Sequence, residues 1–192
     1  PRFDSVKFKS RFPFGRVELF DDSFELKVEI KGWSPFVPGD ADLSGLPVAA
    51  LEYRFRNDSD RVISAVYSFN TINFMSVGSG DDSVLKSSNG LTLWQPGNKD
   101  QPHIEGAFNV SILDDSAYVN CAWFRGGWFD SQSVVWTDVE RGRYYNKQPV
   151  KGGEPSPGGS IYVPFKLQPH ESKDINVLLS WYVPKTDLSY GY

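Results

Sequence analysis

Cysteine and histidine are scarce in this chain of 192 residues, and their scarcity excludes several kinds of site. The single cysteine, Cys121, has no partner for a disulfide within the chain. It lies in the apolar run AYVNCAWF, where we expect a small buried side chain rather than a reactive thiol. The two histidines, His103 and His170, both follow Gln-Pro in expected turns, and no HxH or HExxH pattern occurs. We therefore expect no metal centre, no cofactor and no catalytic triad.

Long apolar runs and dense basic clusters are also missing. No stretch approaches the roughly 20 apolar residues that a membrane-spanning helix requires, so we expect no transmembrane segment. The formal net charge is −4, and no group of Lys and Arg is dense enough to hold a phosphate backbone. Nucleic acid is therefore not an expected partner.

The cellular compartment stays open. The chain starts at Pro1 rather than at a methionine, which we interpret as a processed or trimmed start. A bacterial protein that has lost a signal peptide would be periplasmic or extracellular, and the protein would otherwise be cytoplasmic. One cysteine fits either compartment.

Alternation of apolar and polar residues dominates the sequence. In FELKVEIK the side chains of Phe24, Leu26, Val28 and Ile30 fall on one face, which is typical of a half-buried strand. The turn residues 21–23 join this strand to GRVELF in a hairpin. Further strands are expected within residues 50–57, 61–75, 91–94, 103–113, 117–124, 160–167 and 173–183. The pattern predicts an all-β fold, a two-sheet antiparallel β-sandwich that is supersandwich-like.

One segment, Ser131–Arg141, favours a helix. Ser131 or Ser133 can cap its start, and Gly142 can end it. The loop KGGEPSPGG that comes later in the chain lacks the spacing, the lysine and the strand-to-helix context of a phosphate loop. We therefore expect one short helix and a connecting loop.

A glycosidase needs two carboxyl groups, one of them an acid with a raised pKa. Four acidic residues lie near aromatic residues, namely Glu52, Glu105, Asp130 and Asp138. Glu52 falls on the polar side of an alternating strand, and the other three lie at edges or turns. We expect all four to be solvated surface residues rather than a catalytic pair.

Aromatic residues cluster in AWFRGGWFDSQSVVW, which holds Trp123, Trp128 and Trp136 with Arg125 and Asp130 beside them. Exposed tryptophans can stack on sugar faces, and the charged neighbours can bond hydroxyl groups. Alternatively, the rings fill the core or a contact with another domain, and alternation already places Trp123 inward. The first alternative predicts a free-standing carbohydrate-binding module.

The segment GWSPFVPGDADLSGLPVAALEYRFRN, residues 32–57, resembles the N-terminal domain of the β-glucosidase family that includes non-lysosomal glucosylceramidase, also called bile acid β-glucosidase (glycoside hydrolase family 116). That family carries a Ser-Pro-Phe-Ile-Pro-like turn, a short linker of acidic and small residues, and Leu-Pro-Val-Ala leading into a strand that ends in Asn. Here these features are residues 34–38, 40–45 and 46–49 and the strand to Asn57.

The similarity continues along the chain. Trp136, followed by Asp138 and Gly142, matches the family's short helix. FKLQPHESKDINVLLSWYVP matches its final sandwich strands, and His170 stands where the family usually has glycine. This departure affects only the geometry of the turn.

The resemblance implies a retaining β-glucosidase with an N-terminal β-sandwich, residues 1–192, followed by a helical (α/α)6 catalytic domain. In that family the catalytic glutamate and aspartate lie on the helical domain, so no catalytic residue carries over to this chain. We expect residues 1–192 alone to be inactive, and the abrupt end at Tyr192 fits a severed domain. The implied partners are the helical domain and, for the parent enzyme, a glucoside or glycolipid substrate.

The resemblance also suggests a role for the proline-rich loop, which we expect to dock on the second domain. Its prolines lower the entropy of the undocked loop. Trp33 and Phe36 would supply apolar area, while Asp40 and Asp42 would pair with the partner or bond local amides. The alternative is a loop that packs on its own domain.

Overall fold

The computed structural model describes residues 3–189, which form antiparallel strands and short helices. The strands are β1 (Ser5–Arg11), β2 (Phe14–Phe20), β3 (Leu26–Trp33), β4 (Val48–Asn57), β5 (Ile63–Ile72), β6 (Ser83–Ser87), β7 (Gly90–Gln95), β8 (Gly106–Ile112), β9 (Tyr118–Asn120), β10 (Gly158–Leu167) and β11 (Ser172–Tyr182). The helices are α1 (Ala41–Ser44), α2 (Ser131–Glu140) and the 3₁₀ helix η1 (Pro102–Ile104).

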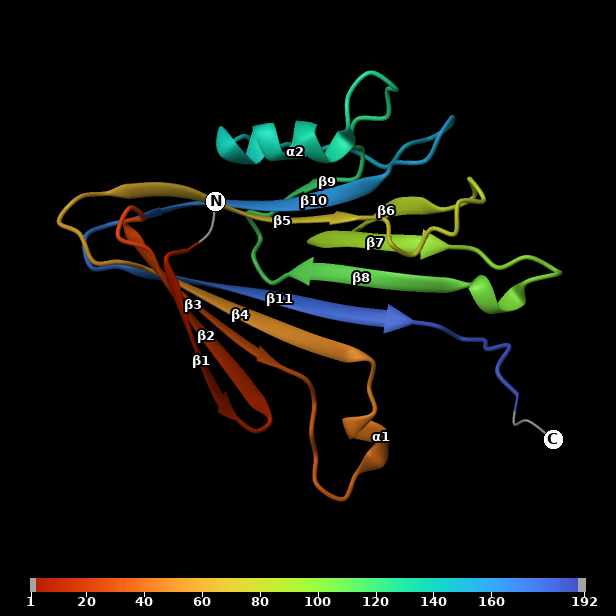
Figure 1. Ribbon diagram of the computed structural model, residues 1–192, viewed down its shortest axis with the longest axis horizontal. Helices are drawn as coiled ribbons and strands as arrows, with labels where there is room; N and C mark the ends of the chain where they lie inside the picture. Colours follow the sequence, from red (N-terminus) through yellow and green to blue (C-terminus); the bar gives the residue numbers. More distant parts are fainter. Residues whose placement is uncertain (1–2, 190–192) are drawn as a thin grey trace.

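The strands form two antiparallel sheets that face each other, which confirms the predicted all-β sandwich (Figure 1). The larger sheet has eight strands in the order β1-β2-β3-β4-β11-β8-β7-β6, and the smaller sheet has three in the order β5-β10-β9. The β4–β5 turn carries the chain from one sheet to the other. At the opposite end of β4, the β3–β4 connection leaves the sandwich as a long loop with α1.

The core lies between the sheets because alternate residues of each strand are apolar. Leu26, Val28 and Phe55 of the larger sheet are buried, as are Ile161 and Val163 of β10. The predicted β2–β3 hairpin is present, with Leu19 opposite Val28. The period-two pattern thus sets both the strands and the face that each one buries.

Two strands escaped the sequence analysis, and one was shorter than expected. Alternation in SVKFKSR, with Val6 and Phe8 on one face, would have indicated β1. The strand β6 is only five residues long. The expected strand 117–124 pairs with β10 only over Tyr118–Asn120, because the chain then turns outward toward α2.

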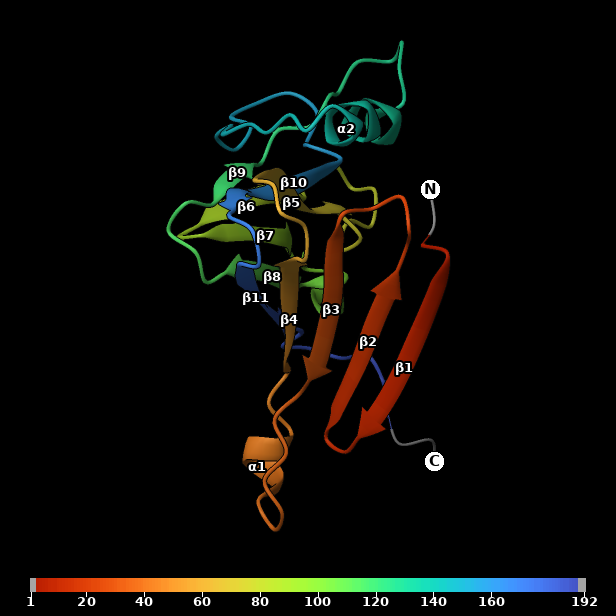
Figure 2. The ribbon, with the colours of Figure 1, turned by 90° about the vertical axis from the view of Figure 1, so that its left-hand side faces the viewer.

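The helix α2 lies over the outer face of the smaller sheet (Figures 1 and 2). Its predicted range was right, but the predicted cap was wrong. The backbone N–H of Ser133 donates to the carboxylate of Asp130 at 2.8 Å, so Asp130 is the N-cap rather than Ser131 or Ser133. An aspartate caps well because its oxygens accept from the free N–H groups of the first turn. Gly142 follows the helix with φ +61°, as expected of a residue that ends one.

The β10 strand contains a proline near its middle. Pro164 lies opposite Val66 of β5, and it falls beyond the part of β10, Ser160 to Tyr162, that pairs with β9. Proline is tolerated there because its nitrogen has no ladder bond to make.

Candidate functional site

The loop between β3 and β4 projects from the sandwich and carries α1 at its far end (Figures 1 and 2). Four large apolar side chains in it are exposed by 41–47% of their surface: Phe36, Val37, Leu43 and Leu46. Single exposed apolar residues are common on protein surfaces. Here four of them lie on one projecting loop and form a group. We call residues 34–47 the docking loop.

The docking loop is held in shape by bonds within itself. The carboxylate of Asp40 accepts from the N–H of Leu43 at 2.9 Å and caps α1. The Ser44 hydroxyl accepts from the N–H of Val37 at 2.9 Å and donates to the Val37 carbonyl at 3.1 Å. Asp40 therefore forms a hydrogen bond within the loop, whereas Asp42 is exposed in the first turn of α1. The loop presents its apolar side chains from a folded frame.

Trp33, at the end of β3, is half-buried, and its ring nitrogen donates to a Glu52 oxygen at 2.8 Å. Lys31 pairs with the same carboxylate at 3.1 Å. Burial raises the pKa of Glu52, but the hydrogen bonds from Trp33 and Lys31 outweigh it, so the pKa is held below its usual value. An acid catalyst needs the opposite shift. Glu52 therefore anchors Trp33 at the base of the docking loop.

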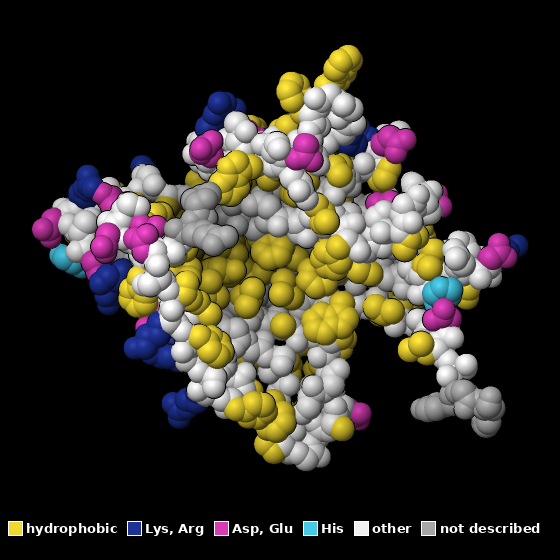
Figure 3. Space-filling view, viewed as in Figure 1, with side chains coloured by type: hydrophobic (Ala, Val, Ile, Leu, Met, Phe, Trp, Pro, Cys, Tyr) yellow, Lys and Arg dark blue, Asp and Glu magenta, His cyan; other side chains and the backbone are white. Residues whose placement is uncertain are grey.

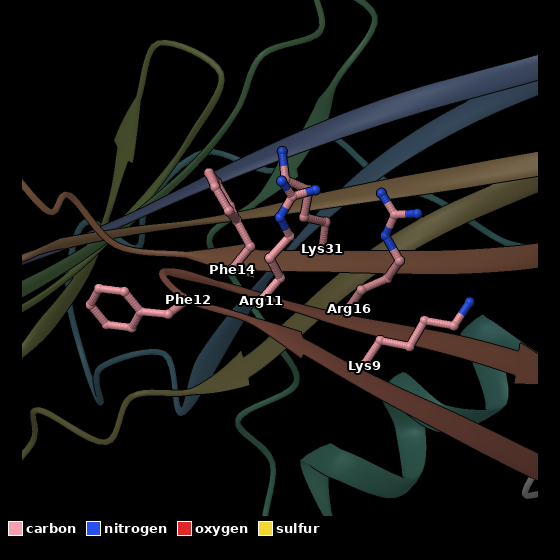
Figure 4. A pocket seen from close by; sticks show the side chains of 6 residues that line it. All are labelled: Lys9, Arg11, Phe12, Phe14, Arg16 and Lys31. Carbon is pink, nitrogen blue, oxygen red and sulfur yellow. The ribbon is translucent and has the colours of Figure 1, made fainter.

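The tip of the β1–β2 hairpin lies against the docking loop. The rings of Phe12 and Phe36 meet edge to face, with centroids 4.7 Å apart. Next to Phe12 is an open pocket of about 540 Å³, also lined by Phe14 and by Lys9, Arg11, Arg16 and Lys31 (Figure 4). The Lys31 ammonium lies over the Phe14 ring, 4.6 Å from its centroid.

The sequence analysis did not predict this hairpin tip, although the alternation of residues along β1 indicates a strand. Lys7 and Lys9 alternate with Val6 and Phe8 along β1, as outward-facing residues do, and Arg11 falls on the same face. Three of the four cations are matched by neighbouring carboxylates: Lys9 by Glu18, Arg16 by Glu29 and Lys31 by Glu52. The pocket wall is thus a ladder of ion pairs on an exposed sheet face.

The three tryptophans do not form one surface, although Trp123 and Trp136 line one pocket between α2 and β5. Trp123 is only 6% exposed and packs on the outer face of the smaller sheet near α2, where its ring nitrogen donates to the Ser160 hydroxyl at 2.8 Å. Its backbone N–H donates to the Ser156 hydroxyl at 2.9 Å. Trp123 is therefore buried, as expected, but it lies on the side of β10 opposite the core residues Ile161 and Val163.

The other members of the cluster lie at the surface on separate elements. Trp128 is 91% exposed in the loop before α2, and Trp136 is 51% exposed on α2. Arg125 donates to the backbone carbonyls of Gly152 and Glu154 and so ties its loop to the neighbouring one. Asp130 is used as the cap of α2. Neither charged residue is free to join a sugar site with the tryptophans.

Each of the four acidic candidates has a local partner. Glu105 pairs with Lys185 at 2.8 Å, and the Tyr145 hydroxyl donates to Asp138 at 3.1 Å. Hydrogen bonds from Ser133 lower the pKa of Asp130. Asp130 and Asp138 lie eight residues apart along α2, roughly 12 Å at 1.5 Å per residue. Retaining glycosidases need about 5–5.5 Å between their carboxyl groups.

The remaining titratable residues are structural. His103 lies 3.7 Å from Asp187 and His170 lies 3.3 Å from Asp60, both at surface turns. Cys121 is fully buried, and burial raises the pKa of its thiol to about 11. Within residues 3–189 no group of His, Cys, Asp and Glu is arranged to hold a metal ion. In the same range no helix has the length and hydropathy to cross a membrane.

The chain matches, over residues 2–191, the family described as beta-glucosidase 2, glycosyl-hydrolase family 116 N-term. The chain belongs to this family. No match was found among curated proteins. Members of family 116 of this kind are the N-terminal domains of β-glucosidases, which implies a partner domain that carries the catalytic residues. The docking loop lies within the segment, residues 32–57, that carried the resemblance.

Proposed function

We propose that this family 116 domain is the non-catalytic β-sandwich of a glucosylceramidase-like retaining β-glucosidase. It packs against a helical (α/α)6 catalytic domain and supports or caps that domain's active site. The catalytic domain supplies both carboxylates, and the substrate of the parent enzyme is a β-glucoside or a glycolipid. The domain contributes no catalytic residue, because its candidate acids are engaged in local bonds.

The observation that carries the proposal is the projecting docking loop of a family 116 domain, with its rigid frame and exposed apolar side chains. A preformed loop loses little conformational entropy when it docks, so its apolar area adds to the affinity. Phe12 of the hairpin tip extends the same apolar surface through its contact with Phe36. Trp33 and Glu52 hold the base of the loop in place.

The test is substitution of the loop in the parent enzyme. Phe36→Asp and Leu43→Asp place charges on residues that are 47% exposed, so the isolated domain should keep its melting temperature within about 2 °C. In the parent enzyme we expect hydrolysis of a chromogenic β-glucoside to fall at least tenfold. Val62→Asp is the matched control, because Val62 is 51% exposed in the β4–β5 turn. Equal activity in all three variants would contradict the proposal.

A second function is favoured by the exposure of Trp128. At 91%, with Phe129 beside it at 71%, this ring is free to stack on a sugar or to meet another protein. We propose carbohydrate binding at this loop as the alternative. Titration of the isolated domain with soluble β-glucans, followed by tryptophan fluorescence, should show saturable binding that Trp128→Ala abolishes. A flat titration contradicts the alternative.

A further inference from the structure

The smaller sheet ends at β5, while the larger sheet continues beyond it. The ring of Tyr67 on β5 lies over β4, with centroids 4.9 Å from Tyr53 and 6.0 Å from Phe55. Farther across, Gly159 of β10 packs against Leu91 of β7. The direction from β10 to β5 therefore runs toward β3, β2 and β1. In the part of the chain that the structure describes, these three strands have no second sheet above them.

The uncovered face is apolar. The register places Val6 and Phe8 of β1, Val17 and Leu19 of β2 and Ile30 of β3 on the same face as the core residue Val28. Phe8 is 66% exposed and Val6 58%, and the other three are half-buried. Figure 3 shows the apolar side chains gathered in a hollow between the two sheets, open to the viewer. In an antiparallel sheet, an apolar face is normally covered by a second layer of strands or helices.

The open edge of β5 is shaped to pair with another strand. The N–H of Asn73 donates to the Pro157 carbonyl at 2.8 Å, which continues the β5–β10 register. Because bonded positions alternate along an antiparallel ladder, the odd-numbered residues of β5 bond β10. The even-numbered residues Ser64, Val66, Ser68 and Asn70 then direct their N–H and C=O groups to the open side.

This edge also lacks the features that normally prevent strand pairing. The β5 sequence ISAVYSFNTI contains no proline and no charged residue. Lysines, prolines and bulges are the usual protection of an exposed edge. A strand of ten residues without them is suited to accept a partner strand.

We propose that β5 accepts a further β-strand from a part of the parent enzyme outside residues 1–192. The strand would extend the smaller sheet over β3, with apolar side chains at alternate positions facing Ile30 and Leu19. Covering β2 and β1 as well would take about two more strands, because strands in both sheets are roughly 4.8 Å apart. The proposal rests on the proposed function, since it requires the chain to be one part of a longer enzyme.

A second copy of this chain does not fit the same edge. Two copies paired antiparallel through β5 are related by a two-fold axis perpendicular to the sheet. Their larger sheets then lie on the same side of the joined edge. The projecting strands β1, β2 and β3 of each copy would occupy the same space. A strand without a large sheet behind it avoids this clash, and a segment of the parent enzyme can be such a strand.

Amide hydrogen exchange tests the proposal directly. In isolated residues 1–192, the amides of Ser64, Val66, Ser68 and Asn70 should exchange at least about 100-fold faster than those of the odd-numbered residues between them. In the parent enzyme both sets should be protected to a similar degree. If the even-numbered amides stay fast in the parent enzyme, the proposal is overturned.

A substitution pair gives a second readout. Ser68→Pro removes one N–H from the open edge, whereas Ser68→Ala keeps it and serves as the matched control. In the isolated chain the two variants should melt within a few degrees of each other. In the parent enzyme the proline variant should melt at least about 5 °C lower than the alanine variant. Equal melting there would overturn the proposal.

A photoreactive residue at position 66 identifies the occupant. The expected cross-link stays within one polypeptide and joins β5 to a segment outside residues 1–192. A product of doubled mass would indicate a second copy and overturn the proposal. Failure of the docking loop is distinguishable, because the Phe36 and Leu43 variants would then keep full activity while the β5 amides remain protected in the parent enzyme.

Discussion

At the scale of the residue, His170 shows how one backbone angle can be detected in a sequence. It occupies the β10–β11 turn with φ +63°, and among residues 3–189 it is the non-glycine residue recorded with a positive φ. The family pattern that the sequence resembles leads us to expect glycine at this position. The left-handed region is costly for any residue with a Cβ. The departure from the family pattern therefore marks a strained position.

Replacing His170 with glycine should stabilise the domain. The left-handed conformation costs roughly 1–2 kcal/mol for an L-residue, and the added freedom of glycine in the unfolded chain offsets part of it. We expect a net gain of about 0.5–1 kcal/mol, or roughly 1–4 °C in a thermal melt. The exposed pair with Asp60 adds little, because both side chains are largely solvated. His103→Gly, in a turn with no positive φ, should bring no gain. A lower melting temperature for His170→Gly would refute this account.

At the scale of the element, the sequence predicted the strands, because these depend on periodicity. It did not predict the exposure and the contacts of single surface residues. Alternation located the core strands, because one wrong register would expose a whole strand. It could not show that Trp128 stands free or that Phe12 meets Phe36. The contact between Phe12 and Phe36 joins two loops that are distant in the sequence. The docking loop was found through its family resemblance, not through its pattern.

The cap of α2 gives a prediction at the same scale. Asp130→Ala removes the acceptor for the Ser133 N–H and should cost about 1 kcal/mol of unfolding free energy in urea. Asp130→Asn keeps an acceptor oxygen and should lose much less. The predicted caps Ser131 and Ser133 provide the comparison, since Ser131→Ala should change little. Equal losses for alanine at 130 and 131 would show that the cap is not where the structure places it.

At the scale of the whole molecule, the folded state lowers the pKa of several carboxyl groups, so its stability should fall in acid. Asp114 is a good probe because its side chain is only 11% exposed. Burial raises its pKa, but hydrogen bonds from Lys173 and Ser116 outweigh burial and lower it. A lowered pKa contributes stability above the unfolded value of about 3.9, and this is lost as the pH falls through the folded value.

The comparison of wild type with Asp114→Asn measures this contribution. At pH 7 the variant should be less stable by about 1 kcal/mol, because the charged hydrogen bond to Lys173 is lost. Below pH 4 the difference should shrink toward zero, since the wild-type carboxylate becomes protonated as well. Asp115→Asn, at the exposed neighbouring position, should melt like the wild type at both pH values. A difference that stayed constant with pH would exclude this carboxylate as the cause.

Pro164 helps to decide at which edge the smaller sheet can gain a strand. On its β9 side the smaller sheet is closed twice: the proline offers no N–H past Tyr162, and the backbone at Lys147 bonds both Val119 and Cys121. On its β5 side the smaller sheet has four alternate residues whose backbone N–H and C=O groups have no partner strand within residues 3–189. A strand that lengthens this sheet must therefore be added on the β5 side, over the β1–β2 hairpin. An insertion at Lys147 would disturb its bonds to β9, whereas a charge or a proline in β5 would hinder the addition of a strand to the sheet.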